Sequence, residues 1–229
     1  MRVQAILFDK DGTLFDFHKT WSPWVGQVIR DLARGEKMRE TALAQAWDFD
    51  LSADRIGPQS IVIAGEVHEL AEAILPHLPD HNQGSLLRYL LRTSAQASGV
   101  EVVALAPFLT DLANRGLKLG LATNDAESVA RAQLRRVAAE AHFDFLAGYD
   151  SGYGGKPAPG MCLAFAAHTG IAPERILMVG DSAHDIEAGR AAGMQVMAVL
   201  TGVAEQDDLA HLTDTILPDI SHLPAWLAG

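Results

Sequence analysis

The chain has 229 residues, of which 48% are hydrophobic and 21% are charged, the proportions of an ordinary soluble globular enzyme. Its formal charge of −11 excludes a general nucleic-acid binder, because no basic stripe is available to neutralise phosphates. A small anionic substrate is still allowed, since a local cation or metal can reverse the field within a site.

Cysteine content and apolar runs indicate the compartment. Cys162 is the only cysteine, so no internal disulfide can form, and its apolar, helix-like setting predicts a buried structural thiol. No apolar run has the length of a signal peptide or of a membrane span. We therefore expect a cytoplasmic protein that binds neither a nucleic acid nor a membrane, and monomer and homodimer both stay open.

The chain begins with an apolar strand over residues 3–8, after which strand patterns vanish and helical spacing takes over. Helices are expected at residues 21–34, 36–47, 59–75 and 84–97. Glycine and proline separate these helices, and a small polar segment at residues 93–99 provides a return hinge. The first strand is thus predicted to precede an all-helical insert.

From about residue 102, strands and helices alternate with short loops, the pattern of a parallel sheet covered on both faces. Strands are expected at residues 118–123, 145–147, 176–179, 195–200 and 215–217, and helices at 107–114, 125–140, 158–169 and 183–192. The predicted fold is an α/β, Rossmann-like doubly wound core, residues 1–15 and 99–229, with an all-helical cap inserted after the first strand, residues 16–98.

Polar side chains collect where four of these predicted strands end. The strand ends and their following loops supply Asp9 and Asp11, Thr123 and Asn124, Lys156, and Asp181 and Asp185. Because ligands bind beyond the carboxyl ends of the strands in open parallel sheets, we expect these groups to share one crevice.

The chemistry of these groups is that of phosphoryl transfer. Hard oxygen ligands with few nitrogens or thiolates favour Mg²⁺. An aspartate can attack phosphorus to form an aspartyl-phosphate, while a second aspartate moves the proton. Lys156, Thr123 and main-chain amides would hold the charged phosphoryl oxygens.

Each motif alone also has a simpler structural explanation. Asp9 and Asp11 could cap a turn, Thr123 and its neighbours could cap the next helix, and Lys156 could be a solvated loop residue. A pair such as Asp181 and Asp185, four residues apart at a helix start, is destabilising without a cation. Because these explanations would have to hold together at separate strand ends, we favour the phosphoryl-transfer interpretation.

The four segments together resemble the haloacid-dehalogenase superfamily of phosphohydrolases. Its pattern is D-x-D-G-T, a Ser or Thr, a Lys, and G-D-x-x-x-D, in this order along the chain. The matching segments here are Asp9-Lys10-Asp11-Gly12-Thr13, Thr123, Lys156 and Gly180-Asp181-Ser182-Ala183-His184-Asp185. The helical insert is similar to the cap of the subfamily that includes phosphoglycolate phosphatases and β-phosphoglucomutases.

The resemblance implies a role for each matching residue. Asp9 would be the nucleophile and Asp11 the general acid/base. Thr123 and Lys156 would bind the phosphoryl group, with Asn124 beside them at the substrate.

The resemblance also implies a magnesium site. Mg²⁺ would be held by Asp9, the main-chain carbonyl of Asp11, and Asp181, with Asp185 acting directly or through water. Lys10 departs from the family pattern, where this position is often apolar, but its side chain need not face the site.

Several functions fit this set of residues. The superfamily's dehalogenases and phosphonatases lack the acid that stands here as Asp11, so an oxygen leaving group is expected. We expect a Mg²⁺-dependent phosphatase for a small phosphorylated metabolite, phosphoglycolate first, with nucleotides and sugar phosphates as competitors. A β-phosphoglucomutase-like phosphomutase and a non-catalytic ligand-binding member are the alternatives.

Overall fold

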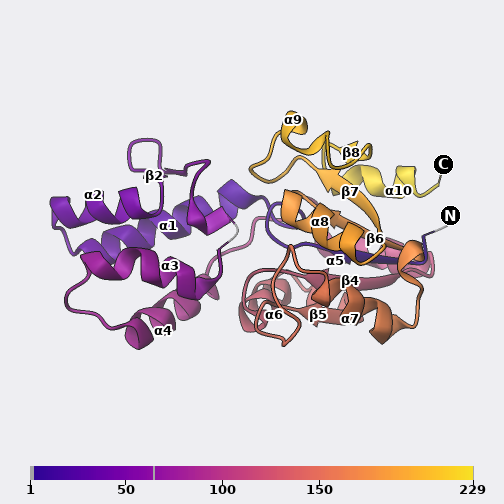
Figure 1. Ribbon diagram of the computed structural model, residues 1–229, viewed down its shortest axis with the longest axis horizontal. Helices are drawn as coiled ribbons and strands as arrows, with labels where there is room; N and C mark the ends of the chain where they lie inside the picture. The colour runs from indigo at the N-terminus through magenta and orange to yellow at the C-terminus, as the bar shows by residue number, and fades with distance from the viewer. Residues whose placement is uncertain (1–2, 64, 229) are drawn as a thin grey trace. The chain divides into compact units, whose positions relative to one another are not determined.

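A computed structural model describes residues 3–63 and 65–228, which form two compact units (Figure 1). The first unit combines the segment up to Phe17 with the chain from Val100 onward, and the second spans His18–Gly99. The chain thus leaves the first unit after a single strand and returns to it for the other five strands of its sheet.

The first unit is built on one sheet of six strands. They are β1 (Ala5–Phe8), β4 (Lys118–Ala122), β5 (Phe145–Ala147), β6 (Ile176–Gly180), β7 (Gln195–Val199) and β8 (Ile216–Leu217). Their order is β5-β4-β1-β6-β7-β8, and every neighbouring pair is parallel. Phe8 at the end of β1 lies opposite Leu121 of β4 and Val179 of β6, so these three strands end side by side.

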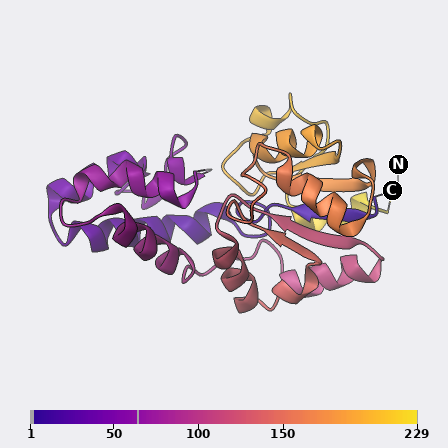
Figure 2. The same cartoon turned by 60° about the horizontal axis from the view of Figure 1, so that its bottom comes forward.

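Both faces of the sheet are buried, as side-chain alternation along β1 shows. Ile6 and Phe8 pack on one face, and Ala5 and Leu7 pack on the other. The first face is covered by α5 (Leu105–Asn114), α6 (Glu127–Arg136), η5 (Ile220–His222) and α10 (Leu223–Trp226), and the second by α7 (Gly160–Thr169) and α8 (Ala183–Ala191). Figures 1 and 2 show these layers, which confirm the predicted doubly wound α/β core.

Helix α6 ends earlier than its sequence predicts. Ala138 has a φ of +54°, and the Ala139 N–H donates to the Leu134 carbonyl at 2.8 Å, a left-handed C-terminal cap. Because this conformation usually calls for glycine, the alanine gave no stop signal, and the helix was expected to reach residue 140. Three short elements complete the unit: η3 (Glu140–His142), η4 (Pro173–Arg175) and α9 (Gln206–Leu209).

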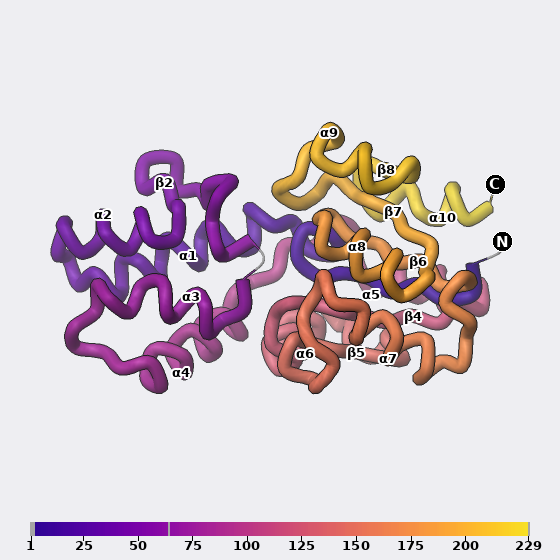
Figure 3. Tube along the Cα trace, viewed as in Figure 1, coloured from indigo at the N-terminus to yellow at the C-terminus, as the bar shows by residue number. Residues whose placement is uncertain are grey.

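The second unit is mostly helical. It contains most of α1 (Phe17–Ala33), then α2 (Lys37–Ala46), η1 (Ile61–Ile63), α3 (Val67–Ile74), η2 (Leu75–His77) and α4 (Gln83–Ser94), which Figure 3 follows along the chain. The expected all-helical insert holds except for one short antiparallel hairpin, β2 (Phe49–Asp50) with β3 (Arg55–Ile56). Asp50 closes its turn by accepting from the N–H groups of Ser52 and Ala53.

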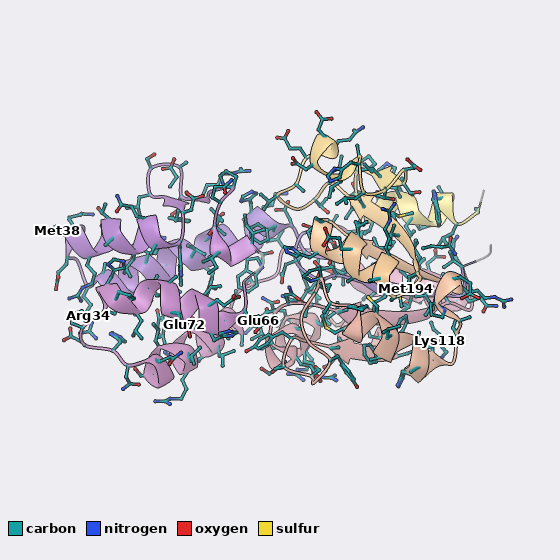
Figure 4. The ribbon with its side chains drawn as sticks, in the orientation of Figure 1. Arg34, Met38, Glu66, Glu72, Lys118 and Met194 are labelled. Atoms are coloured by element: carbon teal, nitrogen blue, oxygen red, sulfur yellow. The ribbon has the colours of Figure 1, made fainter. Side chains whose placement is uncertain are left out.

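The helix predicted over residues 59–75 is also shorter in the structure. Helix α3 begins only at Val67, because the Glu69 carboxylate accepts from the N–H of Glu66 at 2.8 Å and caps the first turn. The core of this unit is aromatic: the rings of Trp24 and Trp47 stack with centroids 5.9 Å apart. Met38, labelled in Figure 4, lies in the first turn of α2 and is 89% exposed. None of the described helices is both long and apolar enough to cross a membrane.

Candidate active site

The site begins where β1 turns sharply away from the sheet. Asp9 directly follows the strand, is 7% exposed, and donates its N–H to the Val179 carbonyl of β6 at 2.8 Å. The N–H groups of Leu14 and Phe15 both donate to the Lys10 carbonyl, which closes a tight turn. Gly12 stands in this turn with a φ of +88°, a conformation that other residues rarely adopt.

Lys156 joins the ends of three strands through its ammonium group. Its Nζ donates to Asp9 Oδ1 at 2.5 Å, to Asp185 Oδ1 at 2.6 Å and to the Ala122 carbonyl at 2.8 Å. All three N–H bonds are thereby used, as a buried ammonium requires. Burial works to lower the pKa of Lys156, but attraction to Asp185 and Asp9 outweighs it, and the pKa is raised.

Asn124 holds the main chain of Lys156. Its Oδ1 accepts from the Lys156 N–H at 2.7 Å, and its Nδ2 donates to the Lys156 carbonyl at 2.9 Å. Both ends of the amide are therefore occupied by one neighbour. These contacts hold the main chain of Lys156 in place, and the substrate contact expected of Asn124 from the sequence stays a prediction.

Thr123 lies at the end of β4, next to the strand that carries Asp9. Its side chain is nearly buried, and its hydroxyl oxygen accepts from the N–H of Asp125 at 3.0 Å. That contact fixes the hydroxyl and leaves its O–H bond able to donate to an anion.

Asp181 and Asp185 follow β6 and are held in different ways. Within the described residues, the only hydrogen bond to the Asp181 carboxylate comes from Thr13 Oγ1, at 3.1 Å. Asp185 instead uses its Oδ2 to cap the start of α8, accepting from the N–H of Ser182 at 3.0 Å and its hydroxyl at 2.7 Å.

Two glycines allow the main chain to approach Asp181 closely. A Cβ at Gly12 would lie 2.3 Å from Asp181 Oδ2, and a Cβ at Gly202 would lie 1.7 Å from the same atom. Neither position tolerates a side chain without a shift. Gly202 was missed at the sequence level, because it lies outside the family pattern and follows β7 as one glycine among many.

The three acidic side chains form a group suited to a divalent cation. Oxygens of Asp9, Asp181 and Asp185 all lie within 4.8 Å of one another, and all three residues are buried. Three carboxylates face one ammonium, that of Lys156, so the described group carries two uncompensated negative charges when ionised.

The pKa shifts of Asp9 and Asp181 follow first from burial and then from that excess charge. Burial, together with Asp185 and Asp11, raises the pKa of Asp9 to about 7, although Lys156 opposes the shift. Burial and the neighbouring carboxylates of Asp9 and Asp185 also raise the pKa of Asp181 well above its usual range. A buried cluster of hard oxygen ligands with unbalanced negative charge fits Mg²⁺.

Asp11 is not one of the three carboxylates of this cluster, and its side chain contacts its sequence neighbour Lys10. Lys10 Nζ lies 2.9 Å from Asp11 Oδ1 and 2.7 Å from Oδ2. Lys10 had no role in the sequence prediction, whereas its ammonium contacts the expected general acid/base. The sequence did contain a sign of this role. If the alternation of β1 is continued by two residues, Lys10 lies on the same side as Ile6 and Phe8, which is otherwise apolar.

Cys162 on α7 is fully buried against the face of the sheet that carries Leu7. Burial raises the pKa of its thiol to about 12, so that it stays protonated at neutral pH. This agrees with the structural thiol expected from the sequence.

The stability of the metal-free protein should fall as the pH rises through the range in which Asp9 ionises. The folded state holds a proton on Asp9 up to about pH 7, whereas an ordinary aspartate loses it near pH 3.8. Protonation thus favours the folded state, and stability is lost between these values. We expect a lower melting temperature at pH 8 than at pH 5, and a larger rise on adding Mg²⁺ at pH 8.

Differential scanning fluorimetry with and without Mg²⁺ measures this pH dependence. Asp181→Asn is the control, because it removes a carboxylate from the cluster while keeping the side-chain volume. An undiminished response of the Asp181→Asn variant to Mg²⁺ would contradict the metal site.

Proteins of known name are similar in sequence to nearly the whole of this chain. The phosphoglycolate phosphatase of Escherichia coli strain K12 is 32% identical over 233 residues, which cover 96% of this chain and 91% of that protein. The tyrosine-protein kinase PtkA of Mycobacterium tuberculosis is 27% identical over 217 residues, which cover 93% of this chain and 68% of that protein.

Solved structures share the fold. The crystal structure of a predicted phosphoglycolate phosphatase from Haemophilus somnus 129PT superposes with a TM-score of 0.73 at 19% identity, covering 99% of this chain and 98% of that one. The family model of the haloacid dehalogenase-like hydrolases matches residues 3–193, which include every residue of the site described above except Gly202. From this match, and from the acidic cluster and lysine at the carboxyl ends of its central strands, the chain belongs to the haloacid dehalogenase-like hydrolase family.

Proposed function

We propose that the protein is a Mg²⁺-dependent phosphatase that hydrolyses a small phosphorylated metabolite through an aspartyl-phosphate. The observation that carries the proposal is the buried carboxylate of Asp9, held by the ammonium of Lys156 beside Asp181 and Asp185. A nucleophile, a cation for the phosphoryl oxygens and a set of metal ligands then lie at one edge of the sheet.

In the first step, an oxygen of Asp9 attacks phosphorus and the bond from phosphorus to the ester oxygen breaks. Asp11 gives its proton to the departing alkoxide, so that the product leaves as an alcohol. Lys156 and the Thr123 hydroxyl hold the phosphoryl oxygens during this transfer. Asp9, Asp181 and the main-chain carbonyl of Asp11, with Asp185 directly or through water, would hold Mg²⁺, which would supply positive charge that offsets the charge of these oxygens.

In the second step, water attacks the phosphorus of the aspartyl-phosphate. Asp11, now ionised, takes a proton from this water, and the bond between phosphorus and Asp9 breaks to release inorganic phosphate. The two aspartates are restored to their starting protonation states, so the cycle balances.

Phosphoglycolate is the substrate that we propose first. The Escherichia coli relative is named phosphoglycolate phosphatase, and the similarity covers 91% of that protein. We further propose that the helical unit at His18–Gly99 acts as a cap that selects the leaving group. Nucleotides and sugar phosphates are the competing substrate classes.

A panel of phosphorylated metabolites tests the substrate proposal. We expect Mg²⁺-dependent release of inorganic phosphate, with the highest kcat/KM for 2-phosphoglycolate and lower values for mononucleotides and hexose phosphates. A flat profile across the panel would contradict a dedicated phosphoglycolate enzyme, and a higher kcat/KM for another class would reassign the substrate.

The same assay separates hydrolysis from transfer to a sugar. A phosphomutase would release little phosphate from a hexose 1-phosphate and would need a sugar bisphosphate to start the reaction. Phosphate release that is independent of any bisphosphate therefore supports the phosphatase over the mutase.

A further inference from the structure

Lys10 is a fully buried lysine that none of the proposed chemical steps uses. It is 0% exposed, and it lies between the two aspartates of the motif that ends β1. Its side chain extends toward the layer that holds α6, on the same face as Ile6 and Phe8. A buried ammonium is retained only when anions and acceptors surround it, so its partners indicate its purpose.

The ammonium of Lys10 contacts both carboxylate oxygens of Asp11. The ammonium lies 2.9 Å from Oδ1 and 2.7 Å from Oδ2. Within the described part of the chain, Lys10 is the only hydrogen-bond or ion-pair partner of the Asp11 carboxylate. The Asp11 side chain is 17% exposed, so without its ion pair with Lys10 it could rotate toward solvent.

The ammonium of Lys10 also contacts two residues other than Asp11. Gln133 Oε1 on α6 accepts from Lys10 Nζ at 2.5 Å, and Asp125 Oδ2 lies 3.2 Å from the same nitrogen. Gln133 is 1% exposed, and Asp125 is fixed in turn because its Oδ1 accepts from the Ala126 N–H at 2.8 Å. The ammonium therefore contacts two groups besides Asp11, and these contacts hold its position.

We propose that Lys10 is a positioning residue that fixes the orientation of the Asp11 carboxyl for proton transfer, with Asp125 and Gln133 as its anchor. This inference rests on the proposed function, because it gives Asp11 the role of general acid/base. It assigns a use to the residue at which this chain departs from the apolar side chain common at that position in the family.

Dependence on the leaving group distinguishes this role from a structural one. An alkoxide needs a proton to leave, whereas p-nitrophenolate leaves without one at neutral pH. Displacing the Asp11 carboxyl should therefore slow an alkyl phosphate much more than p-nitrophenyl phosphate. A general loss of folded enzyme or of phosphate binding would slow both substrates by the same factor.

The experiment compares Lys10→Met, Asp11→Asn and the double variant on 2-phosphoglycolate and p-nitrophenyl phosphate. For Lys10→Met we expect kcat on 2-phosphoglycolate to fall about 10–100-fold, and kcat on p-nitrophenyl phosphate to fall less than about threefold. Since Lys10 acts through Asp11, Lys10→Met should cause little further loss when Asp11→Asn is already present.

Two further variants guard against misfolding and charge effects. Lys10→Met combined with Asp125→Asn removes the cation together with one counterion and should show the same preference between substrates. Lys118→Met is the matched control: Lys118 pairs with Asp144 at 2.7 Å at the start of β4, where Figure 4 labels it, and should leave both activities unchanged.

Each outcome decides between distinct conclusions. Equal losses on both substrates for the folded Lys10 variants, or a full additional loss in the Asp11→Asn background, would overturn the positioning role. If Asp11→Asn itself slows both substrates equally, the general acid/base assignment fails and the proposed mechanism fails with it. If 2-phosphoglycolate is not turned over, the best alkyl phosphate of the substrate panel replaces it in the same comparison.

Discussion

Replacing Asp9 by asparagine is expected to reduce the hydrolysis of every phosphate ester by about 10⁴-fold or more, the usual scale for loss of a nucleophile. An amide cannot form the bond to phosphorus on which both steps depend. The variant should nevertheless be folded, because Lys156 keeps its contacts with Asp185 and the Ala122 carbonyl. The measurement is steady-state release of phosphate at saturating Mg²⁺.

The same substitution should stabilise the metal-free protein above neutral pH. Burial raises the pKa of Asp9 to about 7, so keeping it ionised at pH 8 costs folding free energy that asparagine does not cost. Lower activity together with a higher melting temperature at pH 8 would show that Asp9 serves catalysis at a cost in stability. Substantial turnover by Asp9→Asn would refute the aspartyl-phosphate route, whatever its stability.

Replacing Lys156 by methionine is expected to lower the free energy of unfolding by about 3–5 kcal/mol, because it removes the cation that pairs with Asp9 and Asp185 in a buried cluster of carboxylates. Since those carboxylates repel one another most when ionised, the loss should be greater at pH 8 than at pH 5. Activity should also fall, with a raised KM, because no ammonium is left to hold the phosphoryl group. Urea denaturation at both pH values measures the first effect.

Lys118→Met is again the suitable comparison, because its ion pair with Asp144 is more than half exposed on the lysine side. Exposed pairs of this kind contribute less than about 1 kcal/mol. Similar losses for Lys156→Met and Lys118→Met would mean that the buried cluster does not depend on its lysine. Rescue of Lys156→Met by Mg²⁺ would be consistent with the two cations balancing the same charge.

The arrangement of the sheet could be predicted because local pattern and parallel topology agree. Alternating strands and helices after residue 102 leave few choices other than a parallel sheet, and such a sheet brings the carboxyl ends of its strands together. That reasoning was enough to predict that Asp9, Asp181 and Lys156 lie close together, as the structure shows.

The remaining details depend on contacts between residues distant in sequence. Asn124 could not be seen as the clamp on Lys156, because only tertiary structure brings its amide to that main chain. The close approach of Gly202 to Asp181 likewise depends on tertiary structure. So does the position of Lys10, which contacts Asp125 and Gln133 as well as Asp11. The early end of α6 depends on Ala138 adopting a conformation that its side chain disfavours.

The central position of β1 has a consequence for synthesis on the ribosome. This strand emerges before the other strands of its sheet, yet both of its partners, β4 and β6, come after the helical unit, with β6 ending only at Gly180. The helical unit is contiguous and can complete its contacts while β1 still waits with both edges unpaired. In a nascent chain of this protein, the helical unit can therefore form before β1 has either neighbour, and during that interval both edges of β1 are open to other strands.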